Sequence, residues 1–203
     1  MSNCLRKKKK MEPLGYSKQE LLSIQQKAKQ KSNADKLIEE SSANIRLIIY
    51  QILHDKFGFG QKRIIRVENT IDEYLNTVSS GKMTAGELQY YMKEKCKIDV
   101  KEEVNKVPFR ECFALTERKV DPASMPTAGK YILASICNYF SLIGVCLKTQ
   151  FKFSNKAINE LYGWVRYYIN TLFRVSQFDL TVRDIAECLM EECNYCDSRF
   201  VGA

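Results

Sequence analysis

The sequence predicts an all-α protein that consists of two diverged copies of a three-helix unit, preceded by a basic N-terminal arm and a polar helix. Residues 45–78 align with residues 139–172 without a gap and share nine identities over 34 positions. A second segment, 83–96, aligns with 180–193, and the two segments contain the helix-start signals Thr84-x-x-Glu87 and Thr181-x-x-Asp184. The chain holds only four prolines and nine glycines in 203 residues, so long helices meet few breaks.

The ordered strings YLNTV and YINTL, at matching places in the two copies, favour an internal duplication. The alternative is a chance match, because any two amphipathic helices share apolar positions at helical spacing. We expect a basic arm with a polar helix, a first helical unit, a linker with a short helix, a second helical unit and a tail. Their ranges are 1–34, 35–100, 101–127, 128–196 and 197–203.

Each unit is expected to contain three helices in the same order. The first spans 35–56 in one copy and 128–149 in the other, the second 61–79 and 155–175, and the third 85–96 and 182–193. Apolar residues of the first helix recur at helical spacing, at Ile45, Ile48, Ile49, Ile52 and Leu53. The third helices begin with capping boxes, in which a threonine and an acidic residue three positions later satisfy the free helix-start amides.

An aromatic knuckle joins the first and second helices of each copy, as FGFG in one and FKFS in the other. We expect its phenylalanines, Phe57, Phe59, Phe151 and Phe153, to fill the core where the chain reverses. Gly60 and Ser154 then precede the second helices, and both residue types serve as N-caps. Further along, Trp164 and Tyr168 share a helix face with Leu161, which favours core or inter-copy packing over a base-stacking surface.

The segments outside the two copies are more polar. Residues 1–16 are expected to be a flexible basic arm, and Ser17-x-x-Glu20 opens a separate polar helix of about 15 residues. Pro108 is expected to start a short helix with Phe109, Cys112 and Phe113 on one face. Asp121-Pro122 and Met125-Pro126 mark a turn-rich hinge before the second copy.

The net charge of +8 is concentrated at the N-terminus. Residues 1–34 carry nine Lys or Arg against two acidic residues, whereas residues 35–203 carry 23 against 22. A basic arm binds nucleic acid through phosphates without sequence specificity. The candidate anion- or nucleic-acid-contacting residues are Arg6, Lys7, Lys8, Lys9, Lys10, Lys62, Arg63 and Arg66. The last three lie at an expected helix N-terminus, which suits either an anion site or a solvated turn.

The cysteines and the longest apolar run suggest a cytoplasmic protein. The basic residues 6–10 are followed by MEPLGYSKQE, which lacks the apolar region of a signal peptide, so the eight cysteines are expected to be reduced. Residues 131–147 form an uncharged run that approaches the length of a membrane span. The run includes Asn138, and its counterpart in the first copy is amphipathic and charged. We therefore expect a core helix and no membrane partner.

No motif for catalysis or for a cofactor stands out, so we expect neither an enzyme nor a bound cofactor. Cys193-x-x-Cys196, with Cys188 before it, offers three of the four ligands of a zinc site, and no second such pair exists. These cysteines are the only metal-ligand candidates that the spacing suggests, and buried structural thiols are the simpler account. The single histidine, His54, is expected to end the first helix at its solvent edge.

The string LHDKFGFGQKR at residues 53–63, followed by GKMTAGELQYYMKEK, resembles small uncharacterised phage and prophage proteins of Gram-positive bacteria. The resemblance covers the first copy and implies a phage-linked accessory protein, with no residue-level mechanism attached. The expected function is a non-catalytic interaction with a host or phage protein. The alternative is a DNA-associated regulator that grips phosphates with its basic arm. Against it, the third helices carry many acidic residues that would face phosphate.

Overall fold

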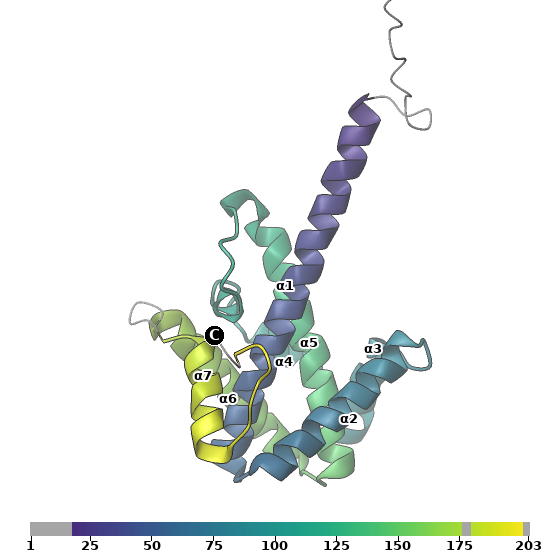
Figure 1. The fold of residues 1–203 in the computed structure, drawn as a ribbon. Helices are drawn as coiled ribbons and strands as arrows, with labels where there is room; N and C mark the ends of the chain where they lie inside the picture. Colours follow the sequence, from purple (N-terminus) through teal and green to yellow (C-terminus); the bar gives the residue numbers. More distant parts are fainter. Residues whose placement is uncertain (1–17, 176–179, 201–203) are drawn as a thin grey trace, which may run out of the picture. The chain divides into compact units, whose positions relative to one another are not determined.

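The computed structural model of the protein describes residues 18–175 and 180–200, and within these ranges every regular element is helical (Figure 1). The all-α prediction is therefore confirmed. The chain divides at Asp35 into two compact units, and the core described below belongs to residues 36–203.

Seven α-helices and two short 3₁₀ helices make up the described residues. They are α1 (Lys18–Phe57), α2 (Gln61–Ser79), α3 (Ala85–Cys96), α4 (Val100–Asn105), η1 (Glu111–Leu115), η2 (Pro122–Ser124), α5 (Met125–Gln150), α6 (Asn155–Val175) and α7 (Val182–Cys193). The predicted second and third helices of both copies are confirmed at α2, α6, α3 and α7. Both capping boxes form, at Thr84 with Glu87 and at Thr181 with Asp184. Ser154 caps α6, because its hydroxyl accepts from the Ala157 amide at 3.1 Å.

The expectation of two separate helices before the first knuckle was wrong. Residues 18–57 form the single helix α1, so the boundary expected near residue 35 is not a break in secondary structure. The physical reason is that no proline or glycine occurs between Lys18 and Phe57, and nothing else in that stretch ends a helix. The expected capping residue Ser17 and the basic arm 1–16 lie outside the described residues.

The linker between the copies is more helical than expected. Helix α4 was not predicted, and its N-cap is Asp99, whose carboxylate accepts from the amides of Lys101 and Glu102 at 3.1 and 3.4 Å. Pro108 begins a turn that leads into the 3₁₀ helix η1 instead of starting an α-helix. Cys112 on η1 is buried as expected, whereas Phe109 remains 41% exposed.

Helix α5 is the centre of the core and contacts α2, α3, α4 and α6. It begins at Met125, and Pro126 lies in its first turn, where a missing amide hydrogen costs nothing, so the expected hinge at this proline is helix. Every residue from Tyr139 to Leu147 is buried. Among the described residues, 122–150 is the one helical stretch long and apolar enough to cross a membrane, and 67% of its most apolar window is buried within the protein.

The buried face of α1 packs into the same core. Ile45, Ile48, Ile49, Ile52 and Leu53, the residues predicted from helical spacing, are all fully buried. A close approach of three helices occurs at Gly144 of α5, where an added Cβ would lie 2.4 Å from the Tyr162 hydroxyl of α6 and 2.5 Å from Met92 of α3. A larger residue there would have to displace the ends of the Tyr162 and Met92 side chains.

The two knuckles pack against each other in a reciprocal way. Phe57 lies 5.2 Å from Phe153 and Phe59 lies 5.1 Å from Phe151, with an interplanar angle of 42° in both pairs. Exchanging each phenylalanine for its counterpart in the other copy converts one pair into the other. Phe59 and Phe153, themselves counterparts, meet edge to face at 5.9 Å. Phe59 is buried, whereas the other three rings are half-buried and also cover the knuckle from solvent.

Other details recur at matching positions. The third helices are each followed by a C-cap residue in the left-handed conformation, Lys97 or Asn194. Equivalent backbone hydrogen bonds follow, from the Ile98 amide to the Met92 carbonyl and from the Tyr195 amide to the Leu189 carbonyl. The Tyr74 hydroxyl meets Thr149 of the other copy at 3.2 Å, and its counterpart Tyr168 donates to Asp55 at 2.8 Å. These correspondences support a pseudo-twofold relation. The duplication itself stays an inference.

The knuckle contact can be tested by mutation. Phe59→Ala removes a buried ring from contact with two others and should lower the free energy of unfolding by about 3–5 kcal/mol. Urea unfolding followed by circular dichroism measures this loss. Tyr90→Ala, at an aromatic that is 68% exposed on α3, is the control and should change stability by less than about 0.5 kcal/mol. Equal, small losses in both variants would show that the knuckle does not hold the core.

Candidate functional site

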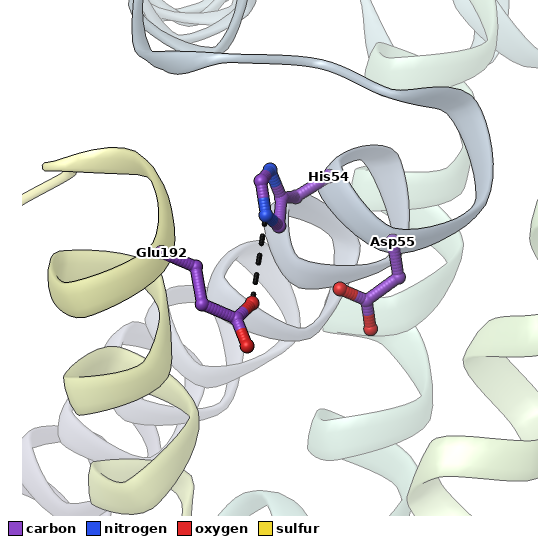
Figure 2. Close-up of side chains that lie close together, drawn as sticks. All are labelled: His54, Asp55 and Glu192. Carbon is purple, nitrogen blue, oxygen red and sulfur yellow. Dashed lines mark ion pairs between the residues drawn. The ribbon is translucent and has the colours of Figure 1, made fainter.

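Three potential metal-ligating side chains meet where α1 and α7 end (Figure 2). His54 and Asp55 lie on the last turn of α1, and Glu192 lies on the last turn of α7. The His54 Nε2 atom is 3.5 Å from the Glu192 Oε2 atom, and one potential ligand atom from each residue lies within 4.8 Å of the others. We call these residues the His54 cluster.

A backbone contact fixes the orientation of the histidine ring. The Nδ1 atom of His54 lies 2.9 Å from the carbonyl oxygen of Phe59 in the knuckle. A carbonyl only accepts hydrogen bonds, so Nδ1 carries the hydrogen. In the neutral ring, the lone pair of Nε2 is therefore the free one, and it faces Glu192.

Two further side chains hold the carboxylates. Gln51, which is 7% exposed, donates from Nε2 to Asp55 Oδ1 at 2.8 Å and to Glu192 Oε2 at 3.4 Å. Its Oε1 atom is buried and has no hydrogen-bond partner among the described residues. The hydroxyl of Tyr168 on α6 donates to Asp55 Oδ2. Burial, and then this hydrogen bond to a charged acceptor, raise the pKa of Tyr168, which keeps the hydroxyl protonated as a donor.

The cluster offers one imidazole nitrogen and two carboxylates, which is a ligand set for a divalent cation. Sequence reasoning missed Asp55 and Glu192 because 137 positions separate them and no local spacing links them. The His54 prediction is confirmed in part, since the residue lies in the last turn of α1 but is half-buried and hydrogen-bonded. The matching positions of the other copy hold Lys148, Thr149 and Lys95, which cannot form such a set.

A groove with aromatic walls borders the cluster, and one of its lining residues, Tyr168, donates to Asp55 of the cluster. It has a volume of about 450 Å³, and its lining residues are Lys56, Trp164, Tyr167, Tyr168, Thr171, Leu172, Leu180 and Ile185. Tyr167 is 58% exposed, and the Lys56 ammonium lies 4.4 Å from the centre of the Trp164 ring. Trp164 is half-buried and forms part of a groove wall. The expected inter-copy packing is found for Tyr168, whose hydroxyl donates to Asp55 of the first copy.

The expected anion site at the start of α2 is only partly available. Gly60 caps this helix without a side-chain hydrogen bond, and Lys62, Arg63 and Arg66 are all exposed beside it. However, Arg63 stacks on Phe59 and Arg66 on Phe151, so both arginines cover the knuckle. The other candidates, Arg6, Lys7, Lys8, Lys9 and Lys10, lie outside the described residues.

The cysteine candidates do not form a cluster in the described part of the chain. Cys193 is buried and its thiol donates to the Leu189 carbonyl, whereas Cys188 and Cys196 are exposed. Among the described residues, the only group arranged to hold a metal is the His54 cluster. Burial raises the pKa of the Cys112 and Cys146 thiols to about 12, which suits inert core residues.

A charged network attaches the segment after α7 to α1. Arg199 donates to Asp197 at 3.0 Å and to the side chain of Asn44 at 2.9 Å, and Arg46 approaches Asp197 at 3.8 Å. Asp197 is 5% exposed. A second groove of about 520 Å³ lies beside this network. Of its arginines, Arg46 and Arg199 belong to the network, and Arg118 pairs with Glu40 at 2.6 Å.

This network predicts a pH dependence of stability. Burial alone would raise the pKa of Asp197, but hydrogen bonds from Arg199 and the charge of Arg46 hold that pKa below its ordinary value. The carboxylate therefore stabilises the fold at neutral pH, and this contribution is lost as the pH falls below about 4. Asp197→Asn should lower the free energy of unfolding at pH 7 by about 1–3 kcal/mol. The difference in the free energy of unfolding between the variant and the parent should shrink at pH 3, as measured by urea unfolding at both pH values. An equal difference at pH 7 and pH 3 would contradict a stabilising role of the Asp197 charge.

The chain matches no protein family, no curated protein and no solved structure. What the two neighbouring sites can do is therefore inferred from their own residues. The His54 cluster has the donor atoms of a cation site, and the groove has the apolar walls and exposed aromatics of a recognition surface.

Proposed function

We propose that this chain is a non-catalytic helical interaction protein that binds a host or phage protein in the groove beside the His54 cluster. The observation that carries the proposal is the aromatic wall of α6, in which Tyr167 is 58% exposed and Trp164 and Tyr168 are half-buried. Tyrosine and tryptophan are enriched among the residues that dominate protein–protein binding energy, because each buries a large area at a small cost in conformational entropy.

The charge at the groove suggests the chemistry of the bound segment. Lys56 lies against the face of Trp164, and in the described part of the chain no carboxylate lies within 4.0 Å of its ammonium. A partner segment that inserts an apolar side chain between Tyr167 and Leu180, with an acidic residue beside it, satisfies both features. We therefore propose an apolar segment that carries an acidic residue.

Two further parts of the proposal concern origin. The resemblance of residues 53–63 to phage and prophage proteins suggests that the chain is phage or prophage encoded and acts in the host cytoplasm. We also propose that the two helical units arose by duplication, because the reciprocal phenylalanine contacts and the matched helix ends recur at equivalent positions.

Site-specific crosslinking tests the groove. A photo-reactive phenylalanine analogue at Tyr167 should crosslink to one defined host or phage protein in cells, identified by mass spectrometry. The same analogue at Tyr90, which is 68% exposed on α3, is the matched control and should not capture that protein. Lys56→Glu reverses the charge at the groove and should weaken the affinity for the captured protein at least about tenfold, since like charges then face each other.

Capture of the same proteins from both positions would contradict the groove as the binding surface. So would an affinity for the captured protein that Lys56→Glu leaves unchanged. Either result would move the interaction to another face of the protein.

The alternative function is a DNA-associated regulator, and the concentration of positive charge in residues 1–34 favours it. A basic arm of this kind supplies phosphate contacts without reading bases. In the described residues, Lys62 is the candidate whose side chain no aromatic ring covers, because Arg63 and Arg66 stack on the knuckle.

Any DNA affinity should therefore depend on the arm. Replacing Arg6, Lys7, Lys8, Lys9 and Lys10 together by glutamine should abolish duplex binding at 100 mM salt and flatten its salt dependence, because the slope counts neutralised phosphates at about 0.9 per contact. The control replaces Lys62, Arg63 and Arg66 by glutamine and should leave most of the slope. Fluorescence anisotropy with two unrelated duplexes measures both. A sequence preference that survives loss of the arm charges would instead favour the regulator.

A further inference from the structure

We propose that His54, Asp55 and Glu192 bind a divalent transition-metal ion of the Zn²⁺ type, which links the C-terminal ends of α1 and α7. This inference goes beyond the proposed partner binding, since it concerns the chain alone and a different set of side chains.

The spacing of the ligand atoms suits such an ion. Zinc binds imidazole nitrogen and carboxylate oxygen at about 2.0–2.2 Å, so two ligands of a tetrahedral site lie about 3.3–3.6 Å apart. The His54 Nε2 and Glu192 Oε2 atoms are 3.5 Å apart. The remaining separations are at most 4.8 Å, so a carboxylate would have to rotate inward by no more than about 1 Å.

The groups behind the ligands are those that orient ligands in known metal sites. A metal-binding histidine donates its other ring N–H to a carbonyl or carboxylate, and metal-binding carboxylates accept hydrogen bonds from neighbouring side chains. Here the Phe59 carbonyl accepts from His54, the Tyr168 hydroxyl donates to Asp55, and the buried Gln51 amide donates to both carboxylates. These hydrogen bonds orient the His54 ring and keep both carboxylates close to it, and a rotation of one carboxylate then completes the ligand geometry.

The local charge also favours a cation. Asp55 and Glu192 approach each other closely, and within the described residues no lysine or arginine nitrogen lies within 4.0 Å of either carboxylate. A histidine–glutamate ion pair alone neutralises one of the two negative charges and only when the ring is protonated. A divalent ion neutralises both with the ring neutral. The imidazole ligand favours Zn²⁺ and its neighbours over Mg²⁺ and Ca²⁺, which prefer oxygen ligands throughout.

Metal binding would stiffen one wall of the aromatic groove. Helix α7 contributes Ile185 to the groove and Glu192 to the cluster, and Tyr168 contributes its ring to the groove and its hydroxyl to Asp55. An ion that ties Glu192 to α1 would fix the end of α7 beside Asp55, the residue to which Tyr168 of α6 donates. Three protein ligands leave one tetrahedral position open to water or to a donor from a partner.

The test titrates ZnCl₂ into the purified, reduced full chain by isothermal calorimetry and records Tm with and without the ion. We expect one-to-one binding and, at a hundredfold excess over Kd, a Tm increase of about 5–10 °C. Glu192→Gln and His54→Gln should each weaken the affinity at least about tenfold. Glu191→Gln removes the same charge one position earlier on the exposed surface of α7 and should leave the affinity unchanged.

Tyr168→Phe adds a readout for the supporting groups. It removes only the hydroxyl that holds Asp55 and should weaken Zn²⁺ binding by about tenfold while the apo protein stays folded. Binding that is unchanged in Glu192→Gln but lost in Cys188→Ser with Cys196→Ser would assign the ion to the exposed thiols and overturn the proposal. Absence of saturable Zn²⁺ binding to the folded parent chain would overturn it as well.

Discussion

The contact between the two phenylalanine knuckles is the constraint on which the rest of the molecule depends. Each knuckle ends one long helix, α1 or α5, and starts the next, so its position decides where both helices of a copy can lie. The rings of Phe57 and Phe59 meet those of Phe153 and Phe151 in two pairs of nearly equal geometry. Two arginines, Arg63 and Arg66, then cover the outer ring faces with their guanidinium groups. Residues that look like a phosphate site in the sequence are thereby used to shield an aromatic core from water.

The knuckle also creates the His54 cluster. A backbone hydrogen bond from the Phe59 amide to the Leu53 carbonyl folds the chain back over the last turn of α1. The Phe59 carbonyl oxygen then lies 2.9 Å from the Nδ1 atom of His54. In the second copy the equivalent bond runs from Phe153 to Leu147, but the residue at the histidine position is Lys148, which donates to Asn155. The same backbone thus supports an imidazole with a fixed tautomer in one copy and an ammonium group in the other. If the copies share an origin, the cluster is a feature that one of them acquired or kept alone.

Local signals allowed most of the helices to be predicted, and long-range contacts could not be. The starts of α3 and α7 follow from capping boxes and those of α2 and α6 from a glycine or serine cap, all of which depend on neighbouring residues. The prediction failed at α1, where a capping motif at residue 17 suggested a separate helix although no breaker follows it. It also missed α4, since the short Asp99 cap carries little signal. The partners of His54 were unpredictable because Glu192 reaches it only through the packing of α7 against the end of α1.

The groove and the cluster are joined through one side chain, and this sharing bears on how they would act. Tyr168 presents its ring to the groove and its hydroxyl to Asp55, so a change in charge at the cluster alters the hydrogen bond that fixes the ring. The two carboxylates of the cluster place negative charge beside Lys56, which follows Asp55 on the same last turn of α1. A bound cation would cancel that charge and leave Lys56 as the dominant charge at the groove, which strengthens attraction for an acidic segment. Ion binding and partner binding would then favour each other, and by linkage a partner that prefers the ion-bound protein must also tighten the ion.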